Sequence, residues 1–266
     1  MSVVTISGGW FHGGMRFAEC LARNLEFRCI DREVIVSKAA AGGVDPEHLR
    51  EALLEPPSLF DRLLTHKKYL YLTLLQAALA EEVKDGRIVY HGYAGHLLLG
   101  GAKPVFRIRV IASQELRIRM AQERLDLDHD QALSYLHKVD VQRKKWTRYL
   151  YGIDWEDASL YDMVLNLGYL YGIEEACEFV TAMVRDHPCF AFTEEHRRAL
   201  GDFALASRVR AALATAAPTA NARVKDITAS GGVLTVSGDY DDTGQMQEVE
   251  RVARSVEGVR NVELQY

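Results

Sequence analysis

The sequence predicts an α/β protein in which a parallel sheet carries helices on both faces and a small α+β unit follows. Apolar runs typical of buried strands alternate with helical segments over about the first 185 residues, and parallel strands need such helical crossovers. Near residue 203 the pattern changes to helix, two strands, helix and strand. With 266 residues, 48% of them hydrophobic, the chain is long enough for a large and a small domain.

The elements of the first part follow from their periodicity and end signals. Residues 3–7 are apolar on both faces, as in a central strand, and a glycine-rich loop leads from them into a helix at 15–25. Asp45 and Pro46 are an N-cap and a first-turn proline. The other expected elements are a strand and a helix within 29–41, helices at 45–54 and 57–84, a strand at 87–92, a short helix at 94–100, a strand at 105–113, helices at 114–125 and 129–152, a strand at 161–168 and a helix at 173–185.

The last part of the chain is expected to fold as a small domain of its own. Its expected elements are a helix of small residues at 203–216, two alternating strands within 222–240 that meet at a glycine pair, a helix at 243–256 and a strand at 259–266. A unit of this size can form a domain. We therefore expect a first domain at residues 1–188, a linker at 189–202 and a second domain at 203–266.

Composition and charge exclude several classes of protein. A net charge of -5 and a pI near 6.0 leave no broad basic face, so we expect no nucleic-acid partner. The chain has no apolar run of about 18 residues and no secretory signal, which predicts a cytoplasmic protein without a transmembrane segment. Cys20, Cys29, Cys177 and Cys189 lack metal-binding spacing, so we expect reduced thiols, mostly in the core, and no metal site.

The loop after the first strand has the glycine spacing of a phosphate-binding loop. In such loops, successive backbone N–H groups and a helix N-terminus point at an anion, and glycine lets the chain wrap closely. Gly8 and Gly13 match the pattern G-x-x-x-x-G-K-[ST], but Gly14 stands at the lysine and Met15 at the Mg²⁺-binding hydroxyl. The alternative is a tight turn that lets the helix pack on the strand.

Three more residues of this segment are candidates for the same site. Gly9 belongs to the same glycine-rich nest as Gly8. His12 is a candidate phosphate donor. Arg16, on the first turn of the helix, would supply the missing positive charge if its side chain folded back onto the loop.

The first 185 or so residues resemble the cytidylate-kinase-like P-loop family. The resemblance rests on TIS with the glycine loop, on CIDREVI at the place of the family's YDREL segment, on Asp140-x-x-Arg143 in the lid region, and on DWEDASLYDMVLNLGYLYGIEEA at the closing strand and last helix. Gly13-Gly14 followed by Arg16 is similar to the family's GSGGRE loop. Residues 203–266 resemble a BON domain through ITASGGVLTVSGDY and VARSVEGVRNV. The implied fold is a nucleoside-monophosphate-kinase-like parallel sheet with a BON-like domain.

The resemblance also implies a place for the phosphate acceptor. Asp31 and Arg32 match the segment that begins the acceptor region, at the carboxyl edge where open α/β sheets bind ligands. A helix N-cap at Asp31 beside a solvated Arg32 is the alternative. The family has GR-x-A where this chain has HGYAGH, so Gly92 and Tyr93 stand in place of an arginine that would hold the acceptor phosphate. His91 and His96 are candidate hydrogen-bond donors in the same segment. A structural histidine at this strand end remains open.

Cations of the predicted lid are the last group of candidates. Arg117 and Arg124 lie on one helix, and Asp140 and Arg143 lie on the next. Phosphoryl transfer depends on cations positioned around the travelling group, which would give these residues catalytic roles. Alternatively, Asp140 pairs with Arg143 or Lys144 along one solvated helix.

Two functions follow from these observations. One is a cytidylate-kinase-like enzyme that transfers a phosphoryl group from ATP, with Mg²⁺, to a nucleoside monophosphate. Losing the loop lysine and hydroxyl together is expected to remove several kcal/mol of transition-state stabilisation. The other is a catalytically inactive module that senses a nucleotide or another anion. The BON-like domain would then bind a protein partner or mediate self-association through an exposed edge strand.

Overall fold

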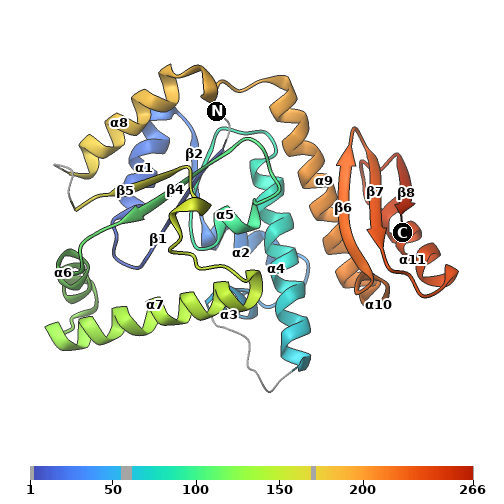
Figure 1. The fold of residues 1–266 in the computed structure, drawn as a ribbon, viewed down its shortest axis with the longest axis horizontal. Helices are drawn as coiled ribbons and strands as arrows, with labels where there is room; N and C mark the ends of the chain where they lie inside the picture. The colour runs from blue at the N-terminus through green and yellow to red at the C-terminus, as the bar shows by residue number, and fades with distance from the viewer. Residues whose placement is uncertain (1–2, 55–61, 169–171, 266) are drawn as a thin grey trace.

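The computed structural model describes residues 3–54, 62–168 and 172–265, so residues 57–61 and 266 of the expected elements lie outside the described residues. Within these ranges, the first part of the chain forms a five-stranded parallel sheet in the order β2-β3-β1-β4-β5 (Figure 1). The strands are β1 (Val3–Gly8), β2 (Arg28–Asp31), β3 (Ile88–His91), β4 (Val105–Ile111) and β5 (Met163–Asn166). Strand β1 is central and almost entirely buried, as its apolar sequence predicts.

Helices α1 (Gly14–Leu25) and α8 (Ile173–Asp186) cover one face of the sheet. Phe17 and Leu21 of α1 are fully buried in one cluster with Ile6 of β1 and Val180 of α8. Because α1 follows the glycine loop directly, this packing fixes the direction in which its N-terminus points.

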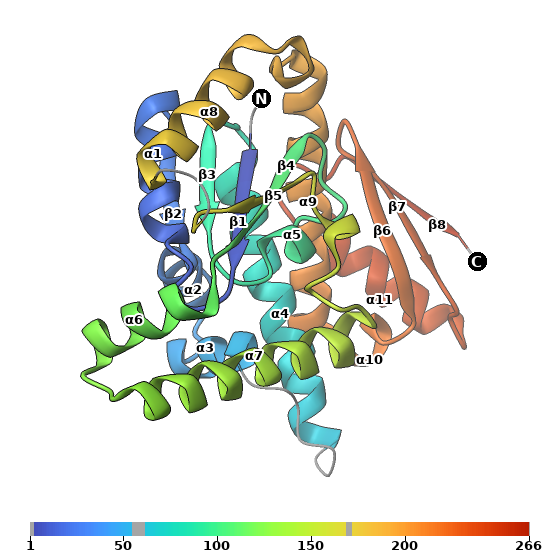
Figure 2. The ribbon, with the colours of Figure 1, turned by 60° about the vertical axis from the view of Figure 1, so that its left-hand side comes forward.

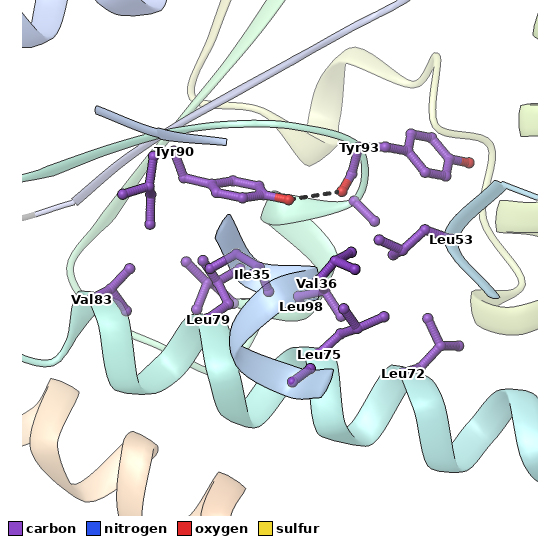
Figure 3. Close-up of a cluster of buried hydrophobic side chains, with 14 of the residues drawn as sticks. Ile35, Val36, Leu53, Leu72, Leu75, Leu79, Val83, Tyr90, Tyr93 and Leu98 are labelled. Carbon is purple, nitrogen blue, oxygen red and sulfur yellow. Dashed lines mark hydrogen bonds between the residues drawn. The ribbon is translucent and has the colours of Figure 1, made fainter. Parts of the chain in front are cut away.

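The opposite face is covered by α2 (Arg32–Ala40), α3 (Pro46–Leu54), α4 (Arg62–Val83) and α5 (Gly95–Leu98). Figure 3 shows Leu75 and Leu79 of α4 in the cluster that also holds Ile35 of α2 and Tyr90 of β3. The Tyr90 hydroxyl donates to the carbonyl of Tyr93 at 3.5 Å, just beyond β3. This core therefore supports the segment that leaves the carboxyl end of β3.

Helices α6 (Gln114–Leu125) and α7 (His129–Tyr151) lie together at one end of the sheet (Figure 2). Ser113 caps α6, and Asp128 caps α7 in a capping box with Gln131. Short 3-10 turns at Ala158–Leu160 and Pro188–Phe190 flank β5 and α8. The α6–α7 pair corresponds to the lid expected from the resemblance.

The C-terminal part has the predicted order of helix, two strands, helix and strand. Its elements are α9 (Glu194–Ala216), α10 (Pro218–Asn221), β6 (Val224–Ser230), β7 (Val233–Gly238), α11 (Thr243–Arg254) and β8 (Asn261–Gln265). Strand β7 pairs antiparallel with β6 and parallel with β8 (Figure 1). The α+β prediction for this part of the chain is confirmed.

Helix α9 is longer than the sequence predicts. It begins at Glu194, capped by Thr193, so most of the segment expected to be a linker is helical. Leu200 is fully buried in the core of the first domain, whereas Val209 and Leu213 are fully buried in the core of the second. One continuous helix thus packs against α4 at one end and the small sheet at the other (Figure 1).

The cysteines differ from the expectation of four reduced thiols. Cys20 of α1 and Cys177 of α8 form a disulfide, and Cys29 and Cys189 are free and exposed. The two paired residues are 157 positions apart and meet only because α1 and α8 pack side by side. Among the described residues, no helix is long and apolar enough to cross a membrane.

Candidate functional site

A cavity of about 280 Å³ opens at the carboxyl ends of β1, β2 and β3. It brings together the glycine loop, the start of α2, the segment after β3 and both lid helices, as expected for a ligand site on an open α/β sheet. Its lining includes these residues predicted from the sequence: Gly8, Gly9, His12, Gly13, Gly14, Met15, Arg16, Asp31, Arg32, His91, Tyr93, Arg124 and Arg143. Trp10, Phe11, Glu33 and Met120 also line it and were not predicted.

The glycine loop is closely packed and ends at an uncapped helix. A Cβ on Gly8 would lie 2.8 Å from the carbonyl oxygen of Val110, so only glycine fits there. Gly13 is the N-cap of α1 with φ 78, a left-handed conformation that suits glycine, and no side chain caps the helix. The first N–H groups of α1 therefore remain available to an anion in the cavity.

His12 is committed to the loop backbone. Its Nδ1 lies 2.8 Å from the N–H nitrogen of Gly9 and 3.0 Å from the carbonyl oxygen of Val110. Burial, and then the nearby Arg117, lower the pKa of His12 to about 4. The ring is therefore neutral at pH 7, and only Nε2 is free to contact a ligand.

Met15 and Arg16 do not supply the groups that a loop hydroxyl and lysine would supply. The Met15 side chain offers no oxygen to a metal and is 48% exposed. The Arg16 guanidinium donates to Glu174 of α8 at 3.1 Å, and both side chains are largely exposed. Arg16 lines the cavity, but in this structure its charge is directed to α8 and not to the loop.

Asp31 and Arg32 form the opposite wall. Asp31 caps α2 by accepting from the Val34 N–H at 3.1 Å, as the capping alternative predicted. Arg32 pairs with Glu33, which also accepts from Arg50 at 2.8 Å. Although burial alone would raise the pKa of Glu33, Arg50 and Arg32 hold it below its usual range. The positive charge of Arg32 is thus already paired with the Glu33 carboxylate.

Arg143 is the lid residue that reaches the loop. One of its Nη atoms donates to the carbonyl oxygen of Gly8. Its guanidinium lies 4.8 Å from the Tyr93 ring centroid and 5.9 Å from that of Trp155, and its Nε has no partner among the described residues. Burial lowers the pKa of Arg143 to about 10, so it stays charged at pH 7. Because Arg143 lines the cavity, its cation lies where it would attract a bound anion.

Arg117 and Asp140 lie outside this cavity. Two guanidinium nitrogens of Arg117 donate to the Asp140 carboxylate at 2.7 and 2.9 Å, and Nε donates to the Trp10 carbonyl at 3.2 Å. Asp140 therefore pairs across the lid and not with Arg143 or Lys144, so the alternative pairing along one helix is wrong. The pair lines a separate cavity of about 680 Å³ between α6 and α7. Arg124, by contrast, is exposed and lines the cavity at the glycine loop.

A buried network that the sequence did not reveal supports the same region. The Ser7 hydroxyl lies 3.0 Å from Nδ1 of His96, and Nε2 of His96 lies 3.3 Å from the Tyr161 hydroxyl, which donates to the Trp155 carbonyl at 2.8 Å. Because Tyr161 uses its proton for Trp155, His96 carries its proton on Nε2 and accepts from Ser7 at Nδ1. His96 is a structural histidine, and no local pattern links residues so far apart in the chain.

The residues present fit a nucleotide's phosphates better than they fit a metal ion. Backbone N–H groups and Arg143 suit phosphate oxygens. Among the described residues, no group of three histidine, cysteine, aspartate or glutamate side chains is placed to hold a metal ion. A Mg²⁺ ion would depend on the phosphates themselves and on Asp31, the carboxylate at the carboxyl end of β2 in the cavity.

The strand order, the loop that leads into α1 and the paired lid helices define a kinase-like α/β fold with a separate small domain. The chain belongs to the cytidylate kinase-like family, whose model matches residues 3–169, and it carries a BON domain at residues 201–266. A crystal structure of an uncharacterized protein from Eubacterium ventriosum superposes with a TM-score of 0.54 at 14% identity, covering 70% of this chain and 100% of that one. At this identity the likeness shows the fold alone.

Two curated relatives are similar over a shorter stretch. A cytidylate kinase of Methanocaldococcus jannaschii is 34% identical over 88 residues, which are 32% of this chain and 49% of that protein. A cytidylate kinase of Thermoplasma acidophilum is 32% identical over 89 residues, which are 34% of this chain and 47% of that protein. The chain thus spans about half the length of the curated relatives it matches.

Proposed function

We propose that the protein binds a nucleotide or another phosphate-bearing small molecule in the cavity between the glycine loop and the lid. The observation that carries this proposal is the uncapped N-terminus of α1 facing the same cavity as the buried Arg143 cation. Both features favour negative charge at one place. Family membership and the two archaeal cytidylate kinases support a nucleotide as this ligand.

The second candidate is phosphoryl transfer from ATP, with Mg²⁺, to a nucleoside monophosphate. It is favoured by the single cavity that joins the loop, on the donor side, to Asp31 and Arg32, on the acceptor side. Arg124 and Arg143 would stabilise charge on the travelling group, and Arg16 would join them only after leaving Glu174. With no lysine and no hydroxyl on the loop, we expect turnover to be slow compared with a complete phosphate-binding loop.

The BON domain is proposed to bind a partner, another copy of the chain included. It is attached through the continuous helix α9, which contributes buried residues to the cores of both domains. A cytoplasmic location remains part of this proposal, and the state of Cys20 and Cys177 in cells tests it, because disulfides are rare in that compartment.

Calorimetric titration of the full chain with ATP plus Mg²⁺ and with CMP tests the binding proposal. Binding of either ligand in the micromolar range would support it, and the absence of heat with both at millimolar concentration would refute it. An assay for ADP formed from ATP in the presence of CMP separates the two candidates. ADP formation that depends on CMP supports transfer, whereas binding without ADP supports a sensor.

A further inference from the structure

His91 lies beside Gly14, the residue that stands in place of the loop lysine. Gly14 stands where the loop pattern places lysine, and a Cβ on Gly14 would lie 3.0 Å from Nε2 and 3.4 Å from Cδ2 of His91. A side chain at residue 14 would therefore compete with the imidazole for the same volume. Glycine at this position makes room for His91.

His91 lines the cavity because of its place in the sheet. It ends β3, where it pairs with Ile6 of β1 on one side and Asp31 of β2 on the other. The parallel register thus puts the imidazole between the glycine loop after β1 and the acceptor wall after β2. It lines the cavity together with both.

The imidazole of His91 has no hydrogen-bond partner among the described residues. Burial, the largest effect, lowers the pKa of His91 to about 4, so the ring is neutral at pH 7 and carries one donor and one acceptor. His12 and His96 are more deeply buried, and both rings bond to neighbouring groups. The His91 imidazole is half-buried and forms no hydrogen bond or ion pair with another described residue. A half-buried imidazole that lines a cavity without a protein partner is free to bond to a ligand.

The alternative substitute for the lysine, Arg16, is occupied elsewhere. Its guanidinium is bound to Glu174 on α8, and its side chain is 62% exposed. The His91 imidazole, by contrast, already lies beside Gly14 of the loop. It does not have to break a hydrogen bond or ion pair with a described residue before it can bind a ligand.

We propose that His91 takes the place of the loop lysine by donating a hydrogen bond from Nε2 to a phosphate oxygen of the ligand at the glycine loop. This inference rests on the proposed function and adds a residue to it. A neutral imidazole supplies a hydrogen bond without a charge, so Arg143 and the α1 N-terminus carry the electrostatic part of phosphate recognition.

The test is calorimetric titration of ATP plus Mg²⁺ into the full chain and three variants. We expect His91→Ala to weaken binding at least tenfold, because the lost hydrogen bond is to a charged group. His91→Gln, whose amide nitrogen has a similar reach, should keep binding within about threefold of the wild type. His129→Ala removes an exposed histidine away from the cavity and should change nothing.

A second pair of variants tests the shared volume. The lysine in Gly14→Lys requires the imidazole to shift, whereas Gly14→Lys combined with His91→Ala gives the lysine room. The double variant should bind ATP at least tenfold more tightly than His91→Ala alone, since it restores a cation at the loop. If His91→Ala proves unstable, the double variant is compared with Gly14→Lys instead, and it should bind ATP more tightly because its lysine has more room.

The failures of the two proposals are distinguishable. If the wild type binds ATP and a folded His91→Ala variant binds it equally well, the role of His91 is refuted and the proposed function stands. If the double variant binds no better than His91→Ala, the shared-volume argument is refuted. If the wild type binds neither ATP nor inorganic phosphate, the proposed function fails and this inference fails with it.

Discussion

Replacing Arg143 with methionine should weaken ligand binding while leaving the stability of the fold nearly unchanged. Burial lowers the pKa of this guanidinium to about 10, a shift that corresponds to about 3 kcal/mol against the cation in the folded state. Opposing this are the hydrogen bond to the Gly8 carbonyl, worth about 1.5–3 kcal/mol, and the stacking on Tyr93, worth about 1–2 kcal/mol. Methionine keeps much of the apolar stem, so these contributions nearly cancel.

We therefore expect the free energy of unfolding of Arg143→Met to stay within about 2 kcal/mol of the wild type. The affinity for ATP should nevertheless fall at least tenfold, because the cavity loses its buried cation and Gly8 loses the donor that fixes the loop. Urea unfolding and calorimetric titration measure the two effects. Arg119→Met, which removes an exposed arginine from the same lid, is the matched control.

Two results would refute this reasoning. Unchanged ATP affinity in Arg143→Met would mean that the loop is held and the ligand bound without this cation. A loss of stability above about 4 kcal/mol would mean that Arg143 is mainly a structural residue and that the balance between burial and bonding is misjudged.

Three further predictions concern the fold. Because the pKa of His96 is lowered to about 4 in the folded state, unfolding takes up a proton below pH 6.5, and stability is lost as the pH falls from 6.5 towards 4. His96→Gln should therefore lose about 2 kcal/mol less than the wild type between pH 7 and pH 5 in urea unfolding; equal losses would contradict this. Leu200→Ala should destabilise the protein by about 2–5 kcal/mol, whereas no change would mean that residues 194–202 act as a linker after all. Reducing Cys20–Cys177 should lower the free energy of unfolding by about 4 kcal/mol, and four reactive thiols in the unreduced native protein would contradict the pairing.

Local patterns were sufficient for most elements of the fold. The apolar run of β1 and the caps at Asp45 and Asp128 each act within a few residues, so they can be recognised in the sequence. The α9 start was missed because residues 194–198 are polar and the capping box ends in His196 instead of glutamate or glutamine. Leu200, its first fully buried residue, is a single apolar signal.

Most of the residues that line the cavity could be named from the sequence, but their contacts could not. Resemblance and glycine spacing led to the loop and the lid arginines. Which way an arginine turns depends on partners far away in the chain, such as Gly8 for Arg143 and Asp140 for Arg117. The pairing of Cys20 with Cys177 depends in the same way on how α1 meets α8. Tertiary packing, not local spacing, decides these contacts.

A thermal-shift series of the full chain with inorganic phosphate, ATP plus Mg²⁺ and CMP tests the central claim most directly. A ligand at about 100 times its Kd stabilises the folded state by roughly 2.7 kcal/mol, which corresponds to a rise of about 5 °C or more for a chain of this size. We predict such a rise with ATP plus Mg²⁺ and a smaller one with inorganic phosphate. An unchanged melting temperature with all three ligands would show that the glycine loop is only a tight turn between β1 and α1.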